Sequence, residues 1–483
     1  MKHFLFLIFL LSIHQIGCAQ EEVNEPSAVP DQPGVKVNLN PEGSVNVRFV
    51  TLLQTWVRSA QLNPGSRYRD EIRNTLSDIS VRRIVLTTIA QLSPKALVLL
   101  NVEGASNSGS DAFQPALDVG VLDAYGEYKI SSYLYLGAGL HQWTGLSRLN
   151  VDGVGSILNL DQPLFQQATW NKLDRLGRVM GIYVKGEAGP VNYRLSLNAP
   201  FEAPATNFAA NTGKGSPSGG SLNQEARNAQ VNVAYMNPVA TSTLLQGYVE
   251  CAFWEKEKHI SPYEINTYHG EKKLFNLGAG FFFRPDGMFT PQQIGLKNPS
   301  LPESSSNPKW IKSGKSTDLF CYAIDATLMY PFSKKADGIA AYVAYYHLDL
   351  GNNYYTVSPI NNITTAGVGL SPINGVGTAF PTTGTGNSWY AKIGYIAPKT
   401  WFGKSRLGLF GTYQYSKLEA LKAPVQVQEA GVNWFVNSNK VKLAVLYRSR
   451  PIYQGNAAYA EISSNAVVNT RKGEMITQLQ FNF

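Results

Sequence analysis

Cysteine is scarce in this sequence. Only three cysteines occur among 483 residues, and one of them, Cys18, lies close to the N-terminus. The other two, Cys251 and Cys321, are too few and too far apart for a disulfide framework or a zinc cluster. We interpret both as small residues of strands, and we expect no metal or other cofactor.

A long apolar run is missing after the first twenty residues. No later stretch reaches about 18 consecutive apolar residues, which excludes a membrane-spanning helix. Amphipathic helical periods are also hard to find. If the protein enters a membrane, it therefore does so as β-strands.

The N-terminus has the features of an export signal. In "MKHFLFLIFLLSIHQIGCAQ" a basic Lys2 precedes an apolar run from Phe4 to Leu11, and a small-residue site follows at 17–19. We predict a signal peptide over residues 1–19, with cleavage after Ala19. In the alternative, Cys18 would become a lipidated first residue, but the preceding triplet lacks the usual Leu at its head.

The chain also lacks a strong charge of either sign. It has 42 basic and 34 acidic residues, and its net charge of +8 falls to +7 once Lys2 is removed. A weak and dispersed excess does not build a nucleic-acid surface. We therefore expect no nucleic-acid partner.

Residues 20–43 form a polar segment with four prolines and two glycines. Such a composition cannot bury enough apolar surface to fold, so it predicts a flexible periplasmic lead-in. The folded domain should begin near Ser44 and cover residues 44–483.

What the remaining sequence does contain is alternation. In "SSYLYLGAGL" (131–140) the even-numbered residues from Leu134 to Leu140 are apolar, whereas the odd-numbered positions hold Tyr and Gly. The stretch "KVKLAVLYRSR" (440–450) repeats the pattern. Period-two alternation between turn residues is typical of strands with one apolar face, so we predict an all-β fold.

The predicted connections differ in length in a directional way. Short turns at 92–95, 130–132, 188–190, 237–240 and 437–440 alternate with long polar stretches near 60–75, 141–176, 200–224, 285–315, 351–386 and 451–469. Short periplasmic turns and long outside loops are typical of outer-membrane barrels. Both termini would then lie in the periplasm, which requires an even number of strands.

We count about eighteen strands, with sixteen as the alternative if the weak strand at 261–268 and one neighbour are absent. The predicted strands cover 44–59, 76–92, 95–105, 117–129, 131–140, 177–188, 190–199, 225–237, 242–254, 261–268, 273–284, 316–331, 338–350, 387–397, 404–418, 424–436, 440–450 and 470–483. A sheet in lipid must pair every backbone group and hence close into a transmembrane antiparallel β-barrel. A barrel of about 16–18 strands encloses an aqueous channel.

The long insertion at 140–181 contains apolar residues that an exposed loop would not hold, namely Ile157, Leu158, Leu160, Leu164 and Phe165. We predict that it folds into the lumen as a constriction loop. The alternative is an outside cap packed on neighbouring loops. Its charged residues are the candidate constriction residues: Arg148, Asp152, Asp161, Lys172, Asp174, Arg175 and Arg178.

Several motifs carry a family resemblance. "GLHQWTGLSR", "VGSILNLDQPLFQQATW" and "GIYVKG", with "VRRIVLTTIAQLSP" upstream and "FNLGAGFFFRP" downstream, resemble the large Bacteroidota group of outer-membrane porins related to phosphate-selective porins O and P. The similarity runs from about residue 76 to 483. It implies a barrel porin whose constriction lies in the 140–181 insertion and suggests phosphate as a solute. The chain has no dense arginine ladder or lysine cluster of the kind used by phosphate-selective members.

Strand parity predicts which charges face the lumen. The expected lumen acids are Asp123, Glu127, Glu187, Glu250, Asp325 and Glu429. The basic set comprises Arg58, Lys392, Lys442 and six candidate anion contacts: Arg48, Arg83, Lys185, Arg194, Arg406 and Arg448. A ring of cations selects anions through its local field, so these residues predict a modest anion preference. The alternative is a mixed-sign wall that only solvates the lumen.

Catalytic signals are weak, and we expect no enzyme activity. Among the histidines, His347 alone has a same-face carboxylate nearby, Asp349, and no nucleophile is suggested. We expect His141 and His347 to face inward. The glycine-rich stretch 373–387 lacks the helix and the Lys of a phosphate-binding loop.

The leading hypothesis is a passive outer-membrane porin for small hydrophilic solutes, with an anion or phosphate preference. The alternative is a plugged barrel that serves as an envelope interaction or assembly component. A lipid-modifying barrel enzyme and an energy-coupled transporter fit less well, since 24 lead-in residues cannot form a plug domain. Expected partners are outer-membrane lipid, lipopolysaccharide, the barrel-assembly machinery, the solute, and further copies in a homotrimer.

The chain ends in "MITQLQFNF" (475–483). Its odd-numbered residues, Met475 to Phe483, should face lipid, whereas the even-numbered ones should face the lumen. We expect this strand to pair with the first one and so remove the open edge. A terminal aromatic after alternating apolar residues also resembles the insertion signal that the barrel-assembly machinery reads, with Phe483 as its last residue.

Overall fold

The computed structural model describes most of the chain from Gly34 to Phe483. The described residues are 34–69, 71–106, 117–142, 145–166, 168–169, 173–174, 177–200, 231–237, 240–257, 267–296, 298–302, 307, 309–333, 337–358, 366–367, 373–398, 405–454 and 467–483. The predicted signal peptide lies outside them, as do most of the lead-in and the candidates Lys172 and Arg175.

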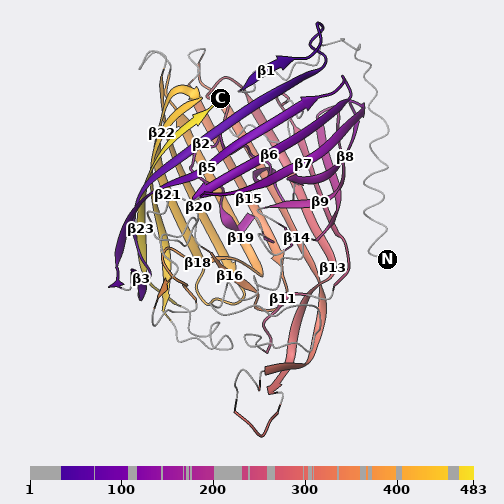
Figure 1. Cartoon of the computed structure of the whole chain (residues 1–483). Coiled ribbons are helices and arrows are strands. Elements are labelled where there is room, and N and C mark those ends of the chain that lie inside the picture. The colour runs from indigo at the N-terminus through magenta and orange to yellow at the C-terminus, as the bar shows by residue number, and fades with distance from the viewer. Residues whose placement is uncertain are drawn as a thin grey trace. The chain divides into compact units, whose positions relative to one another are not determined.

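Sixteen of the described strands close into one antiparallel barrel (Figure 1), in which each strand pairs with the next and β23 returns to β2. In the order of the barrel they are β2 (Asn46–Gln61), β5 (Thr75–Gln91), β6 (Ala96–Ser106), β7 (Leu117–Ser131), β8 (Leu134–Gln142), β9 (Arg178–Ala188), β10 (Val191–Ala199), β12 (Leu244–Ala252), β13 (Leu274–Leu296), β14 (Lys309–Pro331), β15 (Gly338–Asp349), β19 (Gly386–Ile396), β20 (Arg406–Leu418), β21 (Val425–Asn439), β22 (Val441–Gln454) and β23 (Val467–Asn482). The predicted transmembrane β-barrel is confirmed, with the alternative count of sixteen.

Smaller elements decorate this barrel. They are β1 (Val35–Asn38), β3 (Ser66–Tyr68), β4 (Glu71–Ile72), β11 (Tyr235–Met236), β16 (Tyr355–Ser358), β17 (Ala366–Gly367), β18 (Phe380–Gly384) and two single 3-10 turns, η1 (Arg148–Asn150) and η2 (Leu164–Gln166). β1 pairs with β2, so regular structure begins before the expected start at Ser44. Among the described residues, no helix is long and apolar enough to span a bilayer.

Two predicted strands are absent from the barrel, and the count falls from eighteen to sixteen for this reason. β10 pairs directly with β12, so the chain between Ala199 and Leu244 is one connection. Within this connection, the described part of the predicted strand 225–237 forms only the two-residue strand β11. The predicted turn at 237–240 therefore does not join two barrel strands. The described residues of predicted strand 261–268, Thr267 and Tyr268, are not in a strand.

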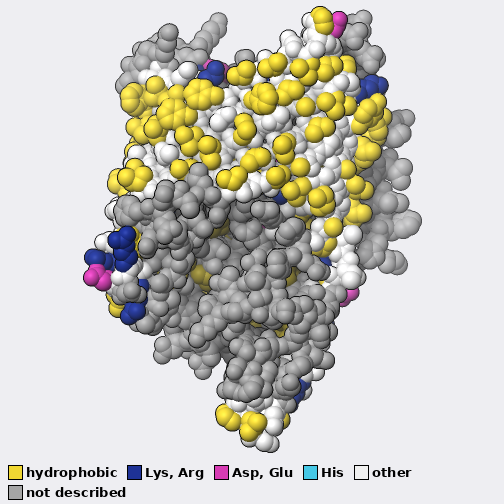
Figure 2. All heavy atoms as spheres, viewed as in Figure 1, with side chains coloured by type: hydrophobic (Ala, Val, Ile, Leu, Met, Phe, Trp, Pro, Cys, Tyr) yellow, Lys and Arg dark blue, Asp and Glu magenta, His cyan; other side chains and the backbone are white. Residues whose placement is uncertain are grey.

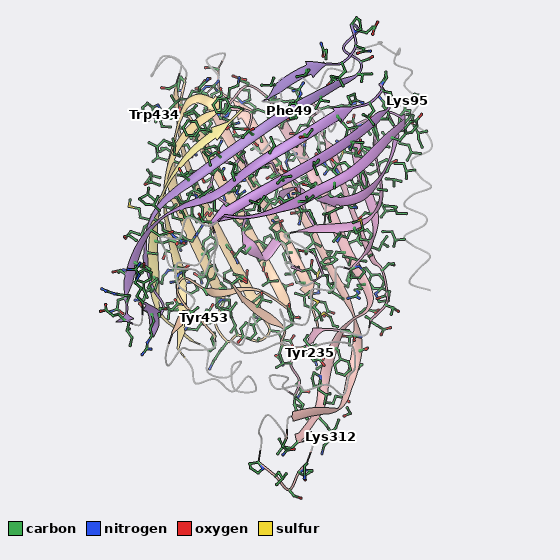
Figure 3. All side chains as sticks on the ribbon, in the orientation of Figure 1. Phe49, Lys95, Tyr235, Lys312, Trp434 and Tyr453 are labelled. Carbon is green, nitrogen blue, oxygen red and sulfur yellow. The ribbon has the colours of Figure 1, made fainter. Side chains whose placement is uncertain are left out.

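The two ends of the barrel differ as predicted. We call the end with tight links such as Leu92–Lys95 and Gly189–Pro190 the short-turn end, and the opposite one the loop end (Figure 1). One predicted loop, 285–315, is mostly strand instead, because β13 and β14 continue as a hairpin beyond the barrel at the loop end. Figure 3 shows Lys312 on this hairpin and Phe49 and Trp434 at the short-turn rim.

The outer surface of the barrel is apolar and has aromatic rims. On β14, Tyr330 lies at the short-turn rim and Phe320 at the loop-end rim, ten residues apart. Ten residues extend about 33 Å along a strand, or about 25 Å along a barrel axis at a tilt near 40°, which is the thickness of the apolar band of a membrane barrel. Hydrophobic side chains cover the same band in Figure 2.

The two faces of each strand differ sharply in burial. Arg58, Arg448 and Glu250 are nearly inaccessible, whereas their outward neighbours Val57 and Tyr447 are more than half exposed. Both free cysteines lie in strands, as interpreted. One expectation is wrong: His347 faces outward, where its ring packs on Tyr322 with centroids 5.1 Å apart.

Terminal pairing closes the sheet at its last residue. Phe483 donates its backbone N–H to Thr51 O at 2.8 Å and accepts from Thr51 N at 2.7 Å. Its ring is 54% exposed on the outer face and stacks on Phe481. The predicted alternation of 475–483 is confirmed, because Ile476, Gln478 and Gln480 are fully buried on the inner face.

We predict that deleting Phe483 lowers the amount of folded barrel in the membrane several-fold without changing the conductance of the barrels that do form. Phe483→Ala is the matched control, since it keeps both backbone hydrogen bonds and removes only the ring. Loss in both variants, measured as the heat-modifiable folded species on gels, assigns the effect to the aromatic signal. Unchanged folding in both variants would contradict the role of the terminal residue.

Candidate pore constriction

The connection from β8 to β9 lies inside the barrel. Of this lumenal segment, residues 145–166, 168–169, 173–174 and 177 are described. Its apolar residues, Leu146, Leu149, Ile157, Leu158 and Leu160, are at most 1% exposed. The predicted in-folded loop is therefore confirmed, and the alternative of an outside cap is wrong.

Inward-facing polar side chains of the barrel hold the backbone of this segment. Lys442 Nζ donates to Ile157 O at 2.9 Å, and Asn433 Nδ2 donates to Leu158 O at 2.7 Å. Gln480 Nε2 reaches Gly155 O at 2.8 Å. Since an irregular buried segment has no neighbouring strand to satisfy its carbonyl groups, the wall supplies the donors.

Apolar contacts fix the same segment from two sides. Leu158 and Leu160 belong to a buried cluster with Trp56, Phe410 and Phe435. Phe165 belongs to a second cluster on the inner faces of β13, β14, β15 and β19, where its ring meets Tyr346 edge-on with centroids 4.9 Å apart. The segment thus fills the part of the lumen beside these strands.

Arg148 lies at the centre of a carboxylate cage. The side chain is 2% exposed, and its Nη1 and Nη2 form a fork on Glu257 at 2.6 and 2.7 Å. Nη1 also lies 3.2 Å from Glu250 Oε2, and Nε lies 3.7 Å from Asp152 Oδ1. The backbone N–H of Arg148 donates to Asp325 at 2.8 Å. Arg148 is therefore a clamp between elements and not an exposed cation.

Glu257 belongs to a second connection that enters the lumen, from the short-turn end. This β12–β13 insert covers residues 253–273, of which 253–257 and 267–273 are described. Tyr268 Oη donates to Glu257 at 2.9 Å, and Arg406 Nη1 donates to His269 O at 2.5 Å. The fork between Arg148 and Glu257 thus joins two inserts that enter from opposite ends.

His269 of this insert is buried against Phe435, with ring centroids 4.5 Å apart. Burial and the nearby Arg406 guanidinium lower the pKa of His269 to about 4. The imidazole is therefore neutral at neutral pH, and the insert adds no cation there.

A second charge cluster surrounds Asp161. Arg82 Nη2 and Arg83 Nη2 lie 2.8 and 2.5 Å from Asp161 Oδ1. Burial alone would raise the pKa of Asp161, but the two guanidinium groups outweigh it and hold this pKa below its usual range. Nearby, Arg448 pairs with Glu429 at 2.7 Å and Glu474 at 2.5 Å.

Three of the remaining basic candidates have a carboxylate neighbour. Arg178 Nε is 3.4 Å from Asp123, Lys185 Nζ is 2.9 Å from Glu127, and Arg406 Nη2 is 2.7 Å from Glu271. Asp174 accepts from Thr169 Oγ1 at 2.7 Å. Arg48 and Arg194 are half-buried inward residues of β2 and β10.

Sequence reasoning missed two members of these clusters. Strand parity predicted that Arg83 points inward and its neighbour Arg82 outward. However, the register between β2 and β5 shifts there, because Gln54 pairs with Arg83 and Thr55 with Val81. This bulge in β5 lets both arginines reach Asp161. Glu257 was missed because the insert that carries it looked like a turn and a strand. No local sequence pattern predicts the bulge. The two acidic residues that follow β12, Glu255 and Glu257, are only a weak sequence signal for the insert.

Solvent still reaches one side of the lumen wall. The inward side chains Glu103, Glu127, Lys185, Glu187 and Arg194, on β6, β7, β9 and β10, keep some exposure; those of Glu127 and Lys185 are 8% and 12% exposed. A smaller hollow, lined among others by Asp161, Phe165, Phe380, Tyr390 and Arg448, lies between the lumenal segment and the loop end. The charged side chains along β6–β10 are therefore less completely covered than inward residues of other strands, such as Arg58 and Arg448.

No protein-family model matches this sequence, and no curated protein is significantly similar to it. Some solved structures follow a similar course of the chain. One is OmpT, an outer membrane protein of Vibrio cholerae, which has 11% sequence identity and a TM-score of 0.45. The match covers 91% of this chain and 98% of OmpT. OprB of Pseudomonas putida matches at 10% identity and a TM-score of 0.49, covering 90% and 94% of the two chains. The anion-selective porin from Comamonas acidovorans matches at 10% identity and 0.46, covering 91% and 100%.

We predict that Arg148→Met loosens the constriction. Removing the guanidinium leaves Glu257, Glu250 and Asp152 buried together without their cation, and breaking a buried pair of this kind costs about 3–5 kcal/mol. Single-channel currents should become larger and noisier. The matched control is Arg73→Met, which removes an exposed ion pair to Glu71 outside the lumen.

Both variants should give the same amount of heat-modifiable barrel as the wild type. Quiet currents of wild-type size from folded Arg148→Met protein would show that the cage does not hold the constriction.

Proposed function

We propose that this protein is an outer-membrane porin, an aqueous channel through which small hydrophilic solutes diffuse passively. One observation carries the proposal: a closed sixteen-strand barrel, apolar outside and charged inside, holds an ordered segment that narrows the lumen without covering its whole wall. A barrel of this strand number is too wide for side chains to fill, so water occupies what the inserts leave open.

The solute path runs along the inner faces of β6–β10. The charged side chains there have both signs: Glu103, Glu127 and Glu187 are acidic, whereas Lys185 and Arg194 are basic, and Lys185 Nζ lies 2.9 Å from Glu127. Such a wall solvates polar solutes of either charge. Electrostatic exclusion is therefore weak, and size at the lumenal segment sets which solutes pass.

The sequence suggested a preference for anions or phosphate, and we propose that this selectivity of the channel is weak. Selectivity needs cations whose field reaches the solute. Here Arg83, Lys185, Arg406 and Arg448 each lie within 3 Å of a carboxylate oxygen. The paired charges cancel most of that field, so we expect only a slight preference for anions.

The cellular setting follows from the same proposal. The predicted signal peptide 1–19 exports the chain, and the barrel-assembly machinery inserts it into a membrane whose outer leaflet carries lipopolysaccharide. The apolar band and aromatic rims support a bilayer location. We also propose that the protein is related to the Bacteroidota porins and that it acts as a passive channel without catalysis.

A second candidate is a plugged barrel that serves as an envelope interaction component. It is favoured by the two inserts that meet at the fork between Arg148 and Glu257, because they fill much of the lumen from both ends. Purified protein in planar bilayers separates the two functions. Stepwise, salt-dependent conductance supports the porin, whereas silence at all voltages together with a stoichiometric envelope partner supports the plugged barrel.

We predict that Asp161→Asn raises the anion preference of the channel. The change removes the carboxylate that neutralises Arg82 and Arg83 while it keeps the shape of the side chain. Under a salt gradient, the reversal potential should shift toward that of an anion-selective pore. The matched control is Glu71→Gln, which alters an exposed carboxylate of the loop end.

Arg83→Ala and Arg194→Ala should shift the reversal potential in the opposite direction. If none of these variants differs from the wild type, the lumen charges do not face the ion path, and the proposed route along β6–β10 is wrong.

A further inference from the structure

Six described aromatic residues form a continuous cluster at the short-turn rim, from the end of β12 to β19. The centroids of neighbouring rings lie from 5.3 to 6.3 Å apart, and four of the side chains are 40–54% exposed on the outer wall. We call this set the rim cluster. Its members, in order of contact, are Phe253, Phe275, Trp254, Tyr330, Phe332 and Tyr395.

Lys273 reaches into the rim cluster. Its Nζ lies 4.5 Å from the ring centroid of Trp254 and 5.1 Å from that of Tyr330. Cation–π attraction holds the ammonium over these two rings. Ring faces are not full hydrogen-bond acceptors, so the ammonium keeps N–H donors for an oxygen ligand. Aromatic rings alone are expected at a membrane interface, whereas a cation held among them requires a further explanation.

The acids near Lys273 are engaged elsewhere. Glu255 Oε1 accepts a hydrogen bond from the backbone N–H of Lys273 at 3.0 Å, and Glu271 pairs with Arg406 at 2.7 Å. In the described part of the chain, no carboxylate forms an ion pair with the Lys273 ammonium. The two ends of the β12–β13 insert, 253–256 and 271–273, thus hold an excess of positive charge, which favours an anionic ligand. Their basic residues are Lys256, Lys272 and Lys273.

The outer wall next to the rim cluster fits an acyl chain. Further along β13, the small exposed Ala279 pairs with Val249 of β12 on one side and with Ile324 of β14 on the other. Both neighbours project from the wall, at 44% and 57% exposure, so a shallow apolar furrow runs between them. A cation at the rim above an apolar furrow matches a molecule with an anionic head and a hydrocarbon tail.

We propose that the rim cluster and Lys273 bind one phospholipid, with its phosphate on the Lys273 ammonium and an acyl chain along Ala279. In the outer-membrane location proposed above, the short-turn end meets the leaflet opposite the lipopolysaccharide, which phospholipids form. Trp254 and Lys273 lie at the two ends of the β12–β13 insert, so the bound lipid joins them. The same insert carries Glu257 to its fork with Arg148 in the lumen.

The inference rests on the proposed outer-membrane location but not on conductance. A barrel that conducts and fails the lipid tests below overturns only the lipid site. A silent barrel that passes them overturns only the porin.

The first test is native mass spectrometry of the full chain, delipidated in mild detergent and titrated with dioleoyl phosphatidylglycerol. We expect one tightly held lipid per chain. Dioleoylglycerol has the same acyl chains and no phosphate, and it should bind about tenfold more weakly, because the charge-assisted contact is lost.

The second test uses Lys273→Met, which keeps an unbranched side chain over the rings and removes the charge. Its affinity for phosphatidylglycerol should fall about tenfold, to the level of dioleoylglycerol. The matched control is Lys95→Met, an exposed lysine of the Leu92–Lys95 turn at the same rim (Figure 3), which should bind the lipid as the wild type does. Heat modifiability on gels confirms that every variant scored is a folded barrel.

Three results overturn the proposal. Unchanged affinity in Lys273→Met, or an equal loss in Lys95→Met, shows that Lys273 does not hold the phosphate. Equal binding of dioleoylglycerol by the wild type shows that the rings and the furrow bind hydrocarbon alone. Displacement of the lipid by inorganic phosphate at equal concentration identifies a site for the free anion instead.

Discussion

The structure depends on one constraint: a sheet that spans a bilayer cannot leave backbone N–H and C=O groups unpaired. The chain meets it by returning β23 to β2, and the pairing continues to the final residue through Phe483 and Thr51. Once the sheet is closed, every strand residue faces either lipid or lumen. The short-turn end, the loop end and the two faces all follow from this closure.

Closure also creates a problem inside the barrel, because sixteen strands enclose more space than their side chains fill. The lumenal segment and the β12–β13 insert occupy part of that space. Their backbone groups need partners, and inward residues such as Lys442 and Asn433 supply them. Their charges need partners too, which Arg148 and Glu257 provide for each other. These lumen charges thus hold the inserts in place, and in the proposed porin their pairing leaves only a slight preference for anions.

The outer surface has its own asymmetry. At the loop end, the described aromatic side chains of the outer face lie on β13 to β22, whereas aliphatic residues such as Ile79 and Met180 take their place on β2 to β10. The least buried charged side chains of the lumen lie behind that same sector, along β6–β10.

The sequence by itself determined the alternation of each strand, because side-chain direction in a strand is a local property with period two. The barrel class, the inward position of Arg48 or Arg448 and the outward row of the last strand could all be predicted in this way. Only the tertiary structure decided that β10 pairs with β12, that a bulge turns Arg82 inward, and that Glu257 meets Arg148 over a separation of 109 residues. Such choices depend on competition among distant pairings, and no local pattern records its outcome.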